Sequence, residues 1–178
     1  METIDFAAQR KRAYDMYRRV AEQKYGYEAK PEQLACCVPC YVAETDDIAM
    51  KEGEKYIMWL FHKVLKVRPE FFVPPGYMSE RSLRAMLEAG VSGYQSVTFK
   101  GLIDMGIIIV GSPATVIEKL SYYTDVLHAG MLVTGGHVGE IPDYLVLKTQ
   151  ELMAKEVMPH FREKPVQPAS EPVEVHSV

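Results

Sequence analysis

Hydrophobic positions along the first third of the chain predict a helix, a strand and a second helix. The first helix runs from about Asp5 to Lys24 and ends near Gly26, a suitable left-handed cap. An apolar run from Leu34 to Ala43 has the length of a strand, although Pro39 removes one ladder donor and favours an edge or an irregularity there. Thr45 can cap the next helix, whose apolar stripe has helical spacing. The stripe consists of Tyr56, Ile57, Leu60, Phe61, Val64 and Leu65.

The second half of the chain repeats the order strand, glycine-containing turn and helix. Its segments are, in order, a strand at 107–110, a turn at 111–113, a helix ended by Gly130, a strand at 131–133, a turn at 135–139 and a helix at 142–162. The first strand is wholly apolar, as expected when both faces are buried. This pattern predicts a parallel α/β unit, whose chemistry lies on the loops that leave the carboxyl ends of the strands.

The connection from Val67 to Gly106 shows no continuous periodicity. Ser79 can cap a short helix over 80–88. Connections of this length are often lids, binding loops or disordered segments. Its aromatic residues either pack the connection onto its own domain or face a substrate, and the sequence leaves both readings open. These residues are Phe71, Phe72 and Tyr77.

Composition narrows the class of protein. A chain of 178 residues suffices for one domain with a real core, and its net charge of −4 gives no electrostatic case for nucleic acid. The beginning of the chain shows no secretory signal, and no apolar run approaches the ~20 residues of a membrane span. We therefore expect a cytoplasmic protein without nucleic-acid or membrane partners. The Pro-, Ser-, Val- and Glu-rich segment 163–178 is predicted to be disordered.

Three cysteines lie in the predicted strand. Cys37 and Cys40 match the C-x-x-C spacing, but residues three apart on a strand point to opposite faces and lie ~10 Å from each other. This separation is beyond disulfide reach. No further Cys or nearby His completes a zinc site, so we predict small buried thiols and no metal.

Two turns carry possible chemistry. Gly111 and Ser112 present backbone amides and a hydroxyl at a helix N-terminus, which can hold an anion such as a phosphate. Gly135 and Gly136 allow close approach of a ligand to the backbone, and His137 could contact a cofactor or transfer a proton. The alternatives are an ordinary capped helix at the first turn and a histidine that only fills the second.

Several segments together resemble the carboxyl-terminal region of bacterial-luciferase-like flavin-dependent monooxygenases. They are Val110-Gly111-Ser112-Pro113-Ala114-Thr115-Val116, Gly135 to Pro142, Val157-Met158-Pro159, Tyr41 to Asp46, Pro74 to Tyr77 and Ser79 to Leu83. The resemblance implies a (β/α)8 barrel, reduced FMN or a related deazaflavin as cofactor, and oxidation of a small organic substrate by O2. It also implies that the connection 67–106 contains the mobile active-site loop.

The chain is too short for a whole barrel, which needs roughly 200 to 250 residues. The resemblance therefore implies the last three βα units with an extra leading helix, in a domain spanning 1–162. No catalytic residue can be transferred, because those residues belong to the missing part. We expect the chain to need a complementing barrel half or self-association. The alternatives are a non-catalytic flavin- or protein-binding remnant and a helical interaction protein.

Overall fold

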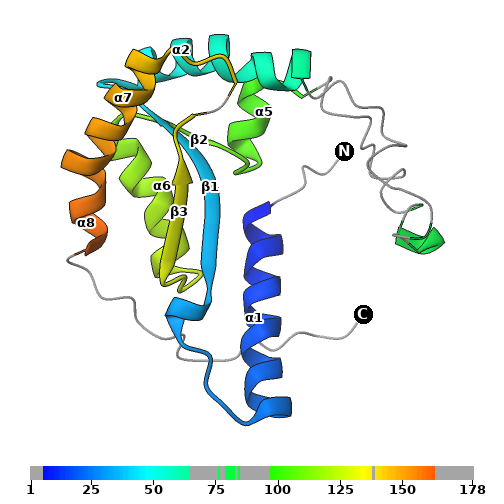
Figure 1. Ribbon diagram of the computed structural model, residues 1–178. Coiled ribbons are helices and arrows are strands. Elements are labelled where there is room, and N and C mark those ends of the chain that lie inside the picture. Colours follow the sequence, from blue (N-terminus) through cyan, green and yellow to red (C-terminus); the bar gives the residue numbers. More distant parts are fainter. Residues whose placement is uncertain are drawn as a thin grey trace.

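The computed structural model describes residues 6–64, 76, 79–82, 84, 97–137 and 139–162, which form a parallel sheet with helices on both faces (Figure 1). The helices and strands, in chain order, are α1 (Phe6–Tyr25), η1 (Pro31–Gln33), β1 (Ala35–Val42), α2 (Asp46–Trp59), η2 (Leu60–Val64), α5 (Phe99–Asp104), β2 (Ile109–Gly111), α6 (Pro113–Asp125), β3 (Met131–Gly135), α7 (Asp143–Leu152), η4 (Met153–Val157) and α8 (Met158–Arg162). The predicted parallel α/β unit is confirmed. A purely helical protein, one of the alternatives, is wrong.

The strand order is β2-β1-β3, with both pairs parallel. β2 pairs with the carboxyl half of β1, at Cys40–Val42, and β3 pairs with its amino half, at Ala35–Pro39. In a (β/α)8 barrel each strand lies between the strands before and after it in the chain. Here β3 lies beside β1 and not beside β2, so the sequential order of three barrel strands is absent from the described sheet. The observed order is typical of doubly wound sheets.

Alternate residues of β1 face two separate cores. On one face, Tyr41 and Ala43 pack with α2, α5 and the start of α7. On the other, Cys36, Val38 and Cys40 pack with α6 and with Val157 of η4. α2 and α5, which lie between β1 and β2 in the chain, therefore cover one face, and α6, which follows β2, covers the other. This arrangement explains why the strand reads as an almost continuous apolar run.

Helix ends follow the local sequence where it contains a capping residue. The Thr45 side chain accepts a hydrogen bond from Ile48 N, and the Ser112 side chain accepts one from Thr115 N. Gly26 takes a left-handed conformation, with φ of 70°, just after α1. All three predicted helix ends are confirmed.

Two predicted boundaries differ from the structure. Part of the connection 67–106 is helical, because α5 begins at its own N-cap, Thr98, and buries Phe99 and Leu102. The helix expected to reach Gly130 ends at Asp125, and His128 then adopts a positive φ of 52°. Ser79 does cap a helical turn, since its hydroxyl accepts from Ser82 N at 3.1 Å.

α1 runs alongside β1 (Figure 1), next to the half of the strand that β2 does not pair. The Tyr14 hydroxyl donates to the Ala35 carbonyl at 2.7 Å. The Arg10 guanidinium donates to Gly106 O and to the Tyr123 hydroxyl, at 3.2 and 2.8 Å. These contacts attach α1 to the strand and to the elements around β2.

The cysteine positions confirm in part the prediction of three unpaired, buried thiols. All three thiols are free, and Cys37 is exposed while Cys36 and Cys40 are buried. The prediction that all three are buried is therefore wrong for Cys37. The candidate lid residues Phe71, Phe72 and Tyr77, and the segment 163–178, lie outside the described residues.

Candidate functional site at the carboxyl ends of the strands

The two glycine turns lie on opposite sides of β1. Gly111, at the end of β2, is in register with Val42, whereas Gly135, at the end of β3, is in register with Pro39. The turns are thus two strand spacings apart, about 9–10 Å, and are offset by three residues, about 10 Å, along the sheet. The candidate cofactor residues therefore form two groups with β1 between them.

The turn at Gly111 already holds a carboxylate. Asp46 Oδ1 accepts a hydrogen bond from Ser112 N at 2.6 Å, and Oδ2 accepts one from the Thr115 hydroxyl at 3.0 Å. Asp46 lies in the first turn of α2, so one side chain joins the N-termini of α2 and α6. These hydrogen bonds, the one from the Ser112 amide first, hold the pKa of Asp46 below its usual value.

This turn does not fit a flavin phosphate in the observed conformation. The amide of Ser112 is bonded to Asp46, the amide of Thr115 is bonded to the Ser112 hydroxyl, and Pro113 has no amide hydrogen. A Cβ atom at Gly111 would lie 2.9 Å from Asp46 Oδ1, so the carboxylate lies close against the backbone of the turn. The predicted cofactor role of Gly111 and Ser112 remains a prediction.

The turn after β3 is more open. A Cβ atom added at Gly135 would meet nothing within 4 Å, and His137 is exposed. At Gly136 an added Cβ would approach Thr149 Cγ2 to 3.3 Å. Gly139 has a φ of 73°, and its Cβ position lies 2.4 Å from Tyr56 O, so glycine is needed there for packing against α2. Space for a ligand thus exists beside Gly135 and His137.

Helix α7 lies against the carboxyl end of β1. The buried Thr149 hydroxyl donates to Val42 O at 2.9 Å, which pairs a carbonyl at the end of the strand. Lys148, the preceding residue, forms a 2.5 Å ion pair with Glu44. These contacts hold α7 beside the carboxyl end of β1, past the point where its pairing with β3 stops. In doubly wound sheets, ligands usually bind at the carboxyl ends of the strands.

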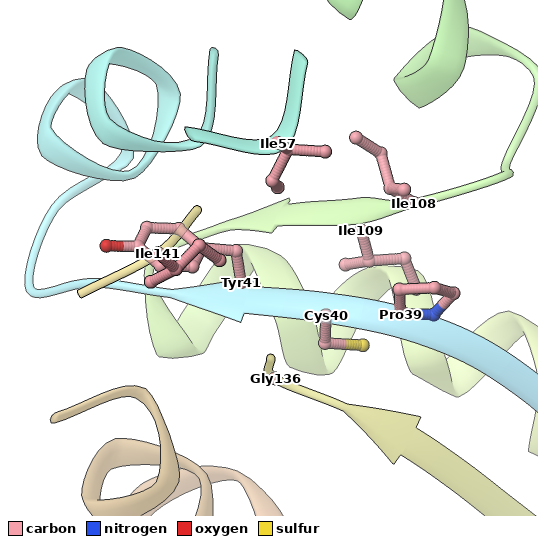
Figure 2. A pocket seen from close by; sticks show the side chains of 8 residues that line it. All are labelled: Pro39, Cys40, Tyr41, Ile57, Ile108, Ile109, Gly136 and Ile141. Atoms are coloured by element: carbon pink, nitrogen blue, oxygen red, sulfur yellow. The ribbon is translucent and has the colours of Figure 1, made fainter. Parts of the chain in front are cut away.

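Figure 2 shows a small hollow at this end of the sheet. Its lining is almost entirely apolar and consists of Pro39, Cys40, Tyr41, Ile57, Ile108, Ile109, Gly136 and Ile141. The Tyr41 hydroxyl donates to Glu52 Oε2 at 2.7 Å. Burial, followed by this hydrogen bond to a carboxylate, raises the pKa of Tyr41. The hollow presents no charged group to a ligand.

Sequence reasoning missed the partners at this end of the sheet. Tyr41 and Asp46 stood out only as the ends of a segment that resembles the family, and nothing in the sequence distinguished Thr149. Among the described residues, no group of three or more His, Cys, Asp or Glu side chains could hold a metal ion. None of the described helices combines the length and apolar character that crossing a bilayer requires.

Comparison with known proteins gives a match at the level of the fold. No protein-family profile matches the chain, and no curated protein sequence matches it. Among solved structures, it resembles the oxygenating constituent of 3,6-diketocamphane monooxygenase from Pseudomonas putida, a type II Baeyer-Villiger monooxygenase in complex with FMN. The TM-score is 0.58 at 23% identity, over 86% of this chain and 40% of that one.

A second solved structure gives the same result. The monooxygenase RslO1 from Streptomyces bottropensis matches with a TM-score of 0.57 at 18% identity, over 89% of this chain and 40% of that one. The chain thus spans about 40% of the length of these two structures. At this identity the comparisons show a shared fold, in which a three-stranded parallel sheet with its helices resembles part of a flavin-dependent monooxygenase.

Proposed function

We propose that this chain is the carboxyl-terminal part of a luciferase-like, flavin-dependent monooxygenase that oxidises a small organic substrate with O2. The observation that carries the proposal is the match of 86% of the chain to a monooxygenase whose structure contains FMN. The order of the motifs around Gly111, Gly135 and Val157 supports the same family. Reduced FMN or a related deazaflavin would be the cofactor and would supply the oxygen chemistry.

The proposal includes completion by another polypeptide or by self-association. The chain covers only 40% of the matching structure. The resemblance implies that the catalytic polar residues of the family belong to the part that it lacks. What this chain contributes is a border of the flavin site, formed by Gly111, Ser112, Gly135, Gly136 and His137. Phe71, Phe72 and Tyr77 would form a lid over the substrate.

A non-catalytic remnant is the second candidate, and specific contacts favour it. Asp46 fills the Gly111 turn, and Thr149 holds α7 against the end of β1. Both contacts close positions at which a ligand would enter. A remnant of this kind would keep the fold and bind flavin or a protein without turning over substrate.

Flavin titration of the completed protein separates these candidates. The chain would be mixed with a polypeptide carrying the five preceding βα units, beginning with any such reading frame next to its own gene. FMN fluorescence reports binding, and consumption of an added organic substrate in the presence of reduced FMN and O2, beyond that of a protein-free blank, reports turnover. Quenching with substrate consumption supports the enzyme, and quenching without it supports the remnant. Absence of both would contradict the proposed function.

A further inference from the structure

We propose that the Asp46 carboxylate takes the place of a flavin phosphate at the turn between β2 and α6 and closes this turn to external phosphate. The inference rests on the proposed function only in that a flavin would border this turn. Its geometry concerns residues of this chain alone, and its test does not require flavin.

The geometry is that of a bound anion. One carboxylate oxygen lies 2.6 Å from Ser112 N and the other lies 3.0 Å from Thr115 Oγ1, so both oxygens are held by donors of the α6 end. Backbone amides and a hydroxyl at a helix start are the donor set that commonly binds phosphate. Asp46 occupies one amide and one hydroxyl of that set, so a phosphate at this turn would have to compete for these two hydrogen atoms.

The absence of a side chain at Gly111 allows the carboxylate to approach. A Cβ atom there would lie 2.9 Å from Asp46 Oδ1 and 2.7 Å from Thr115 Cγ2. The glycine that looks suited to a phosphate in the sequence therefore accommodates a side chain from the neighbouring helix. This contact joins residues 66 positions apart and could not be read from the motif itself.

Electrostatics hold the carboxylate in place. Asp46 lies in the first turn of α2 and accepts from the first turn of α6, so two helix N-termini stabilise one negative charge. Lys119 adds a further attraction. A phosphate that entered beside Asp46 would place two anions at the same donors, and their repulsion opposes binding.

The test measures the binding of inorganic phosphate to the full chain by NMR, through the amide resonances of Ser112 and Thr115. Asp46→Ala and the similarly sized Asp46→Asn remove the carboxylate. Asp47→Ala is the matched control, because it removes the same charge from the next exposed position of α2. Resonances of β3 report whether each variant keeps the fold.

We expect phosphate to leave the two amides unmoved in the wild type and in Asp47→Ala. In Asp46→Ala or Asp46→Asn the amides should shift saturably, with binding at least about tenfold tighter than in the wild type. Saturable shifts of equal affinity in the wild type would overturn the inference, as would folded Asp46 variants that do not respond. Failure of the proposed function would instead appear as absent FMN binding in the completed protein, whatever phosphate does here.

Discussion

The hydroxyl of Thr149 in α7 donates a 2.9 Å hydrogen bond to the carbonyl oxygen of Val42, the last residue of β1. Thr149 is 1% exposed and Val42 is equally buried, so water cannot replace this bond. The contact holds the long carboxyl-terminal helix at the end of the sheet.

Replacing Thr149 with valine should destabilise the protein by about 1–3 kcal/mol. The substitution keeps the shape of the side chain but leaves the buried carbonyl of Val42 without its partner. Urea unfolding followed by circular dichroism measures the change. Thr124→Val is the matched control, because the Thr124 hydroxyl bonds only within its own region of α6, to Ser121 O and Asp125. Equal losses of unfolding free energy in both variants would show that the bond to β1 stabilises the protein no more than the local bonds of Thr124 do.

Gly139→Ala should cost at least about 2 kcal/mol, because the new methyl group would meet Tyr56 O and the residue would keep an unfavourable positive φ. The distance from the Cβ position to that oxygen is 2.4 Å. Gly135→Ala is the comparison, since its Cβ position is open, and it should stay within about 1 kcal/mol of the wild type. Thermal and urea unfolding of both variants check this difference. If Gly139→Ala were as stable as the wild type, the turn would not pack against α2 as described.

Only Cys37 should react rapidly with a thiol reagent in the folded protein. Cys37 is exposed, whereas burial raises the pKa of the Cys36 thiol and raises that of Cys40 to about 12. Ellman's reagent should therefore find one thiol in the native state and three after unfolding. Cys37→Ser should abolish the fast reaction. Fast reaction of two or more thiols in the folded wild type would contradict the buried positions of Cys36 and Cys40.

Asp46 should make stability depend on pH in the acid range. Its folded-state pKa is lowered, so the stabilisation is present above the unfolded pKa of about 3.9 and is lost as the pH falls through the lower folded value. The urea midpoint of the wild type should exceed that of Asp46→Asn near neutral pH, and the two should converge below about pH 4. The difference between the two urea midpoints at each pH removes the effect of other carboxylates with lowered pKa values, such as Glu44 and Glu151. A constant difference down to strongly acid pH would show that the charge of Asp46 is not responsible.

Local features of the fold were predictable because their causes lie within a few residues. Thr45 and Ser112 each cap the helix that follows them, and β1 is identified by an apolar run of strand length. α5 was missed because its capping residue, Thr98, lies in a connection without continuous periodicity.

Long-range relationships were not predictable from the sequence. Alternation of strands and helices is compatible with a barrel order and with a doubly wound order, and only packing decides between them. The pairing of Asp46 with Ser112 likewise depends on how β1 and β2 lie side by side. The candidate residues were therefore correctly located at strand ends, while their mutual placement was not.

The position of β3 has a kinetic consequence for any assembly that completes a barrel. Five residue pairs in register join β3 to β1, on the edge that the preceding barrel strand would occupy. An incoming polypeptide would have to wait until these pairs open before the strands could exchange. Completion could then proceed no faster than that opening, so excess of the incoming polypeptide would accelerate it only up to this limit.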